Sequence, residues 1–164
     1  MTTRTFAPWV EPVAAETLSG AEELLEFARS QPAAFWDRPS PLAGWTYKDM
    51  LGHLAGDTGK VSSSAMRAAV TGRPFENPPD FADGGDALNA NDVADRRSRS
   101  VEELIAEIAH DRQEWADLMR QLRDADEDAR WDGFPLTLGQ YLRICAPHDR
   151  EHLAELRTAL EGNK

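Results

Sequence analysis

Apolar residues recur at intervals of three and four along four long segments of the chain, and no segment alternates with the two-residue period of a β-strand. This spacing places the apolar side chains of each segment on one face of an α-helix. The segments run from Pro12 to Ser30, from Thr46 to Thr71, from Ser100 to Arg123 and from Thr137 to Leu160. Four amphipathic helices in 164 residues predict an all-α, antiparallel four-helix bundle in which residues 1–164 form a single domain.

Capping residues mark several ends of these predicted helices. Ser100 is followed three residues later by Glu103, which is the pattern of a capping box at a helix N-terminus. Thr46 and Asp49 have the same spacing at the start of the second helix. Gly72 follows the second helix, and we expect it to end that helix in a left-handed conformation.

Two features interrupt the helical pattern. Residues 73–99 form a long irregular stretch that contains PFENPPDFADGGD, and its second half, DALNANDVADRR, predicts a short helix. We expect this Arg73–Arg99 segment to cover one end of the bundle. Pro147 falls inside the fourth helix and predicts either a kink or a restart of the helix with proline in its first turn.

The composition narrows the class of function. The chain has 29 acidic against 18 basic residues and a formal charge of −11, which argues against binding to nucleic acid or through a polybasic membrane anchor. No apolar run approaches the ~18–20 residues of a transmembrane helix, and the N-terminus lacks the apolar stretch of a signal peptide. A single cysteine excludes an internal disulfide. We therefore expect a cytoplasmic protein with a small-molecule substrate.

The chain has four histidines, and helical geometry separates three of them from the fourth. At 100° per residue, His148 and His152 lie about 40° apart on the apolar face of the fourth helix. His53 lies on the flank of the apolar stripe of the second helix, whereas His110 lies opposite the stripe of the third and is expected to face solvent. Three inward imidazoles predict a site for Zn²⁺ or Ni²⁺ with open positions for water and substrate.

A second interpretation of these histidines stays open. A single inward histidine is more often a hydrogen-bonded core residue than a metal ligand. Two imidazoles on one helical face are costly to bury without partners, which favours ligation by His148 and His152. His53 joins them only if the second and fourth helices are neighbours, which the periodicity alone does not establish.

Three side chains near these histidines carry alternative roles. Asp57 follows the first histidine by one helical turn and could orient an imidazole, accept a proton from a bound thiol, or pair with Lys60. Asp149 could accept an imidazole N–H or pair with an arginine of its own helix. Cys145 shares a face with the fourth-helix histidines and could be a fourth ligand or a reactive thiol, although a small core residue is the favoured interpretation.

Two motifs in the chain resemble those of a known family. Residues 44–55, GWTYKDMLGHLA, resemble the second-helix motif of DinB/YfiT-like proteins, and residues 148–157, HDREHLAELR, resemble their fourth-helix motif. This family includes the N-terminal domain of mycothiol-dependent maleylpyruvate isomerases and the bacillithiol transferases. The resemblance in order and spacing extends over roughly residues 24–160.

The resemblance implies an up-down-down-up four-helix bundle that is often a homodimer. It also implies a divalent metal held by His53, His148 and His152. Characterised members of the family use a low-molecular-weight thiol, which they transfer or use to isomerise an electrophilic substrate. Some members carry a carboxylate at the position of His148, so three histidines are one of at least two variants of the ligand set.

Residues and resemblance together predict a metal-dependent thiol S-transferase or isomerase. In this hypothesis the ion, Zn²⁺ or Ni²⁺, ionises a small thiol of the mycothiol or bacillithiol type, and Asp57 acts as the catalytic helper. The alternative is a non-catalytic metal-binding bundle that sequesters a ligand or serves as an interaction module. A third interpretation is a helical bundle whose histidines are simply packed in the core.

Overall fold

The structure, a computed structural model, describes residues 6–42, 44–75 and 86–161, except for the side chains of residues 57–59, 159 and 161. All regular elements in these ranges are helical, apart from an isolated bridge between Pro39 and Thr46. The helices are α1 (Val10–Ser30), α2 (Ala33–Trp36), α3 (Tyr47–Leu54), α4 (Asp57–Thr71), α5 (Asp86–Arg96), α6 (Val101–Met119), the 3₁₀ helix η2 (Asp124–Asp126), α7 (Leu138–Cys145) and α8 (His148–Glu161). The predicted all-α fold class is confirmed.

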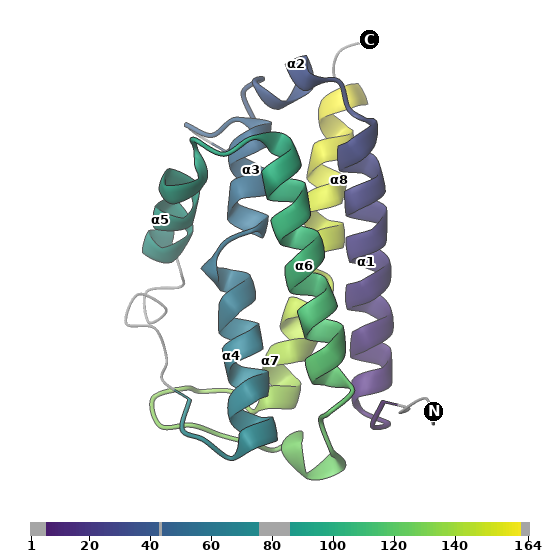
Figure 1. The fold of residues 1–164 in the computed structure, drawn as a ribbon, viewed down its shortest axis with the longest axis vertical. Helices are drawn as coiled ribbons and strands as arrows, with labels where there is room; N and C mark the ends of the chain where they lie inside the picture. The colour runs from purple at the N-terminus through teal and green to yellow at the C-terminus, as the bar shows by residue number, and fades with distance from the viewer. Residues whose placement is uncertain (1–5, 43, 76–85, 162–164) are drawn as a thin grey trace.

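The long helices form four columns of a bundle (Figure 1). One column is α1, the second is α3 followed by α4, the third is α6, and the fourth is α7 followed by α8. The first and fourth columns run in one direction and the second and third in the other, which is the up-down-down-up order. Neighbouring columns α1 and α8 are therefore parallel, as are α4 and α6, so the simple antiparallel arrangement is not what forms.

The second predicted helix is not continuous, and the prediction of one helix from Thr46 to Thr71 was wrong. It divides at Ala55 and Gly56, where Gly56 adopts an extended conformation with φ −85° and ψ −168°. A Cβ atom on Gly56 would lie 2.3 Å from the Oδ2 atom of Asp92 in α5. Position 56 therefore requires a glycine, because α5 approaches the backbone closely at the break.

The fourth predicted helix also divides, at Ala146 and Pro147. Of the two alternatives for Pro147, the restart is what forms, because α8 begins at His148 and the N–H of Glu151 donates to the carbonyl of Pro147 at 2.9 Å. Proline has no N–H to donate into the preceding turn, so the hydrogen-bond ladder of α7 ends at this point.

The predicted helix caps are confirmed. Full capping boxes form at Thr46 with Asp49 and at Ser100 with Glu103. Gly72 ends α4 with φ 66°, in the left-handed region that favours glycine. The third helix ends at Met119, four residues before the expected boundary.

The described buried apolar residues divide into two clusters, one toward each end of the bundle. The first joins the start of α1 and the end of α6 to α4 and α7, and includes Val10, Met66 and Leu138. The second joins the end of α1 and the start of α6 to α3 and α8, and includes Leu24 and Leu153. Both helix breaks fall between these clusters, at the middle of the bundle (Figure 1).

Helix α5 belongs to the segment that was expected to cover one end of the bundle. It packs beside α3 and α4 instead, with Arg96 and Val93 against Gly52 of α3 (Figure 1). Residues 76–85 of the segment lie outside the described residues. Among the helices that the structure describes, none has both the length and the apolar character needed to cross a bilayer.

Candidate metal centre

Three histidines meet between the two apolar clusters. His53 is the penultimate residue of α3, His148 is the first residue of α8, and His152 follows one turn later. One nitrogen from each ring lies within 4.8 Å of the others, and the ring centroids are 5.3 Å (His53–His148), 5.1 Å (His53–His152) and 4.6 Å (His148–His152) apart. The expected meeting of these rings is therefore present. His110 is exposed, as expected.

The two helix breaks place these rings. His53 lies at the end of α3, just before the chain bends at Gly56, and Trp45 packs against its ring at a centroid distance of 5.7 Å. His148 occupies the first turn of α8 because Pro147 ends the ladder of α7. Each break therefore places an imidazole at the middle of the bundle, between the two apolar clusters.

Burial makes two of the imidazoles neutral bases. It lowers the pKa of His53 from the usual 6.5 to about 3, with further lowering by His148 and His152. Burial likewise lowers the pKa of His148 to about 4, with a contribution from His152. Neutral imidazoles have a lone pair available to a metal, so no proton must leave these two rings at neutral pH before an ion binds.

The donor set fits a transition-metal ion such as Zn²⁺. The Nδ1 atom of His53 is buried and has no hydrogen-bond partner, an arrangement that costs free energy unless another group occupies that position. Three imidazoles are also the ligand set of open zinc sites, in which the ligand nitrogens lie about 3.4 Å apart around a tetrahedral ion. Metal binding by these residues stays a prediction.

Glu155 orients the third imidazole. Nδ1 of His152 lies 2.8 Å from Oε2 of Glu155, one turn later on α8. A carboxylate on one ring nitrogen fixes the tautomer and raises the basicity of the other nitrogen. Nε2 of His152 is therefore the atom left for an ion. The side chain of His152 is 16% exposed, so the cluster can be approached from this side.

Asp149 has a partner that neither sequence interpretation anticipated. Its carboxylate accepts two hydrogen bonds of 2.7 Å from Nε and Nη2 of Arg112 on α6. Nη2 also donates to the carbonyl of Leu54 at 3.4 Å, and the guanidinium lies 4.5 Å from the centroid of the Trp115 ring. Arg112 thus links α6 to the residue after His53 and to the residue after His148.

Arg112 was missed by the sequence analysis, although a signal was present. It lies four residues after Ile108 and three before Trp115, on the apolar stripe of α6. A cation in the middle of an apolar stripe needs a buried partner, because an unpaired charge is very costly to bury. The residue is only 4% exposed and Asp149 is 3% exposed, so the pair lies in the interior of the bundle.

The structure supports the core interpretation of Cys145. Its thiol lies within hydrogen-bonding reach of Tyr141 and Ser62, and burial raises its pKa. A raised pKa disfavours the thiolate that a reactive cysteine needs. The group of potential metal ligands found among the described residues consists of the three histidines and does not include Cys145.

The proposed helper Asp57 is the first residue of α4, so it lies near the break that follows His53. Its side chain lies outside the described part of the structure. Its role toward an imidazole, a thiol or Lys60 therefore stays a prediction.

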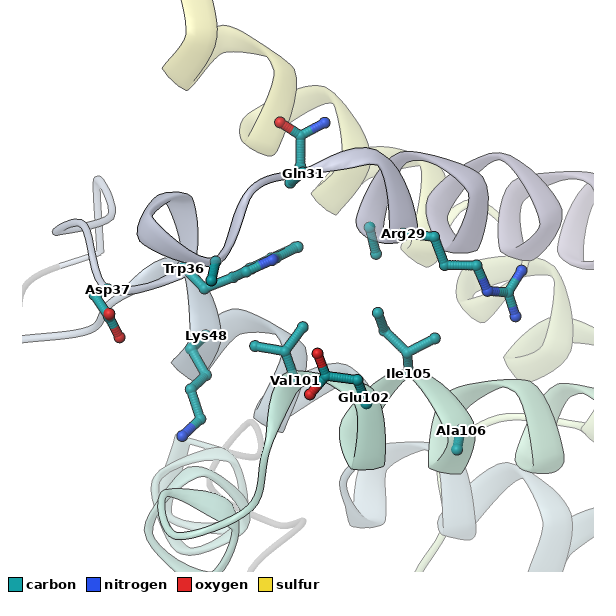
Figure 2. Close-up of a pocket in the computed structure, with 11 residues that line it drawn as sticks. Arg29, Gln31, Trp36, Asp37, Lys48, Val101, Glu102, Ile105 and Ala106 are labelled. Atoms are coloured by element: carbon teal, nitrogen blue, oxygen red, sulfur yellow. The ribbon is translucent and has the colours of Figure 1, made fainter.

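Two cavities bear on where a ligand binds. A small one of about 30 Å³ is lined by Thr17, His53, Ser62, Arg112, Cys145 and His148, among others. A larger one of about 610 Å³ lies among the end of α1, α2, the start of α3 and the start of α6, where Trp36 and Ile105 contribute apolar surface and Arg29 and Glu102 contribute charge (Figure 2). None of the three clustered histidines lines the larger cavity, so its volume does not make it the site of chemistry.

Comparisons with known proteins give a family and a fold. The family model described as the mycothiol maleylpyruvate isomerase N-terminal domain matches residues 18–158. No curated protein matches the chain by sequence. A crystal structure of the mycothiol-dependent maleylpyruvate isomerase is similar with a TM-score of 0.72 and 16% identity, and a structure of a histidine-to-alanine mutant of that enzyme with a TM-score of 0.72 and 15% identity. Each match covers 90% of this chain and 60% of the other. The structural likeness establishes the helical fold, and the chain spans about 60% of the length of the isomerase it matches.

Proposed function

Since the chain belongs to the family of mycothiol maleylpyruvate isomerase N-terminal domains, we propose that it is a divalent-metal-dependent enzyme that activates a low-molecular-weight thiol. The thiol, of the mycothiol or bacillithiol type, would be transferred to an electrophilic small molecule or used to isomerise it. The observation that carries the proposal is the cluster of three imidazoles, in which one nitrogen of each ring lies within 4.8 Å of the others and a buried nitrogen of His53 has no partner.

The roles of the residues follow from the geometry. His53, His148 and His152 would hold Zn²⁺ or Ni²⁺, and Glu155 fixes the ring of His152. When bound, such an ion supplies the positive charge that lowers the pKa of a coordinated thiol toward neutrality. Asp57 remains the proposed acceptor of the thiol proton.

Access to the cluster determines how a substrate approaches. The cavity beside His53 and His148 measures about 30 Å³, whereas small-molecule sites usually enclose about 300–1,000 Å³. The body of a thiol would therefore stay outside this cavity, and only its reacting atom would enter the cluster. The exposed side of His152 is the side from which it would come.

The same small cavity favours a second candidate function, a non-catalytic metal-binding bundle that sequesters a ligand or serves as an interaction module. Such a protein needs a metal centre but no enclosed space for two reactants. The enzyme would turn over a substrate, whereas the sequestering bundle would not. Both would bind a metal ion, which a bundle with histidines simply packed in its core would not.

Metal analysis of untagged protein tests the metal centre. After loading with Zn²⁺ or Ni²⁺ and removal of excess ion, we expect about one equivalent per chain in the wild type and in His110→Ala, whose exposed ring is the matched control. We expect loss of the ion in His53→Ala and in His148→Ala. Less than about 0.2 equivalents in the wild type would refute the centre.

A conjugation assay then separates the two candidate functions. The loaded protein is mixed with a panel of thiols and electrophiles, with and without chelator. Turnover that the chelator abolishes supports the enzyme. A fully loaded protein that is inert toward the whole panel supports the sequestering bundle.

A further inference from the structure

The guanidinium of Arg112 is only partly used by its protein partners. Nε donates to Asp149, and Nη2 donates both to Asp149 and to the carbonyl of Leu54. The side chain is only 5% exposed, and its Nη1 atom is buried without a hydrogen-bond partner. Buried donors in native proteins are almost always satisfied, so an unpaired cationic N–H pair needs a ligand or a water.

The space that Arg112 shares with the histidines is the small cavity. It is lined by Arg112, His53 and His148, and by the polar side chains of Thr17 and Ser62. Its volume of about 30 Å³ exceeds the minimum of about 10–15 Å³ that a water needs, and is far below that of an enclosed organic ligand. The cavity therefore accepts one or two atoms of the size of oxygen, nitrogen or sulfur.

Charge determines what kind of atom suits this cavity. Asp149 balances the charge of Arg112, and the histidines beside it are the proposed ligands of a dication. An ion held by neutral imidazoles leaves an excess of positive charge at this point, and the free edge of a guanidinium is a strong donor to anions. An anionic donor atom is thus favoured over a neutral one.

From these observations we infer that Nη1 of Arg112 is an anion-binding donor beside the imidazoles of His53 and His148. It receives the charged atom of a small monoanion, either the sulfur of a thiolate or an oxygen of a hydroxide or carboxylate. This inference rests on the proposed metal-dependent function for the identity of the neighbouring charge. It adds to that function a protein residue that would stabilise the ionised form of the thiol.

The test measures anion binding rather than turnover. Azide is titrated into the cobalt-loaded full chain, and its binding is followed by the visible absorption of Co²⁺. The variants are Arg112→Met and Arg112→Lys, since lysine can still pair with Asp149 but has only one nitrogen. Arg150→Met is the matched control, because Arg150 is a half-exposed arginine of the same helix as Asp149 and pairs with Glu16 and Glu23 of α1 and not with Asp149.

We expect both Arg112 variants to raise the azide Kd about tenfold or more, which is the usual effect of one charge-assisted hydrogen bond, while cobalt stoichiometry stays near one. Arg150→Met should leave the azide Kd unchanged. An azide Kd within about twofold of the wild type in a cobalt-loaded Arg112 variant overturns the inference. If Arg112→Met does not fold, Arg112→Lys decides by the same criterion.

A metal-free arm separates this inference from the proposed function. If the wild type binds no cobalt, the metal centre fails, and azide is tested by its effect on the Tm of the metal-free protein. A rise in Tm that Arg112→Lys abolishes and Arg150→Met retains supports the anion site alone. The absence of any rise in the wild type overturns the anion site together with the metal centre.

Discussion

The guanidinium of Arg112 and the carboxylate of Asp149 are joined by two hydrogen bonds of 2.7 Å in the interior of the bundle. Asp149 directly follows His148, and Arg112 also reaches the carbonyl of Leu54, which directly follows His53. One ion pair therefore connects the two segments that supply the clustered histidines. Its stability should affect both the fold and the geometry of the site.

Removal of one partner of this pair should be strongly destabilising. Asp149→Ala leaves a buried, uncompensated guanidinium, and we expect it to lower the free energy of unfolding by about 3–5 kcal/mol. Urea unfolding of the metal-free protein measures this change. Arg150→Ala, one residue further along α8, removes half-exposed ion pairs and should lower the free energy of unfolding far less than Asp149→Ala does. Equal effects of the two substitutions would show that the Arg112–Asp149 pair does not stabilise the bundle.

Substitution by alanine should change the stability of the protein in opposite directions at two glycines. A Cβ on Gly56 would lie 2.3 Å from Asp92 Oδ2, so Gly56→Ala should force α5 away from the α3–α4 break and destabilise the fold by about 1–3 kcal/mol. In α1, a Cβ on Gly20 has its nearest neighbour at 3.6 Å, so Gly20→Ala should stabilise the helix by about 0.5–1 kcal/mol. Thermal unfolding of both variants gives the comparison. Stabilisation by Gly56→Ala would contradict the close approach of α5.

The lowered pKa values predict how the metal-free protein responds to acid. In the unfolded chain the imidazoles take up protons near pH 6.5, whereas folded His53 and His148 do so only near 3 and 4. The unfolded state therefore binds more protons as the pH falls below about 6.5, and stability decreases in that direction by up to about 1.4 kcal/mol per pH unit for each ring.

Urea midpoints of the metal-free protein at pH 7, 6 and 5 measure this dependence. The urea midpoint of His53→Gln should fall less steeply between pH 7 and pH 5 than that of the wild type. The midpoint of His110→Gln, on the exposed side of α6, should fall as in the wild type. A midpoint that stays constant or rises from pH 7 to pH 5 would be inconsistent with buried, neutral imidazoles.

Glu155 should influence metal affinity without contacting the ion. Its carboxylate holds Nδ1 of His152, and loss of such a partner usually weakens metal binding about 10–100-fold. Because Glu155 is about half exposed, we expect Glu155→Gln to lie at the lower end, near tenfold. Competition with a chromophoric chelator measures the affinity, with Glu151→Gln as the exposed control on the same helix. Equal affinities of the two variants would exclude an orienting role.

Local signals made much of the fold predictable. The capping boxes at Thr46 and Ser100 and the left-handed Gly72 depend on residues within one turn, and each formed as expected. The break at Gly56 was not predictable in this way, because the close contact at that glycine is with Asp92 of α5, which is 36 residues away in sequence. Helical periodicity continues across Gly56, so the pattern indicates one helix where the structure has two.

The site was predictable in part for a similar reason. The rings of His148 and His152 lie on one face of α8 because the two residues are four positions apart. His53 joins them only because the second and fourth columns of the bundle are in contact. Arg112 shares the apolar stripe of α6, but its partner Asp149 is in a different helix and could not be identified from spacing. A side chain held across the bundle becomes evident only when the columns are assembled.

The most direct test of the metal centre is anomalous diffraction from crystals of zinc-loaded protein, measured on both sides of the zinc absorption edge. The account predicts one peak between α3 and α8, about 2.0–2.1 Å from a nitrogen of each of His53, His148 and His152. A zinc peak that is bonded to the two α8 histidines but not to His53, or one located elsewhere in the molecule, would contradict it.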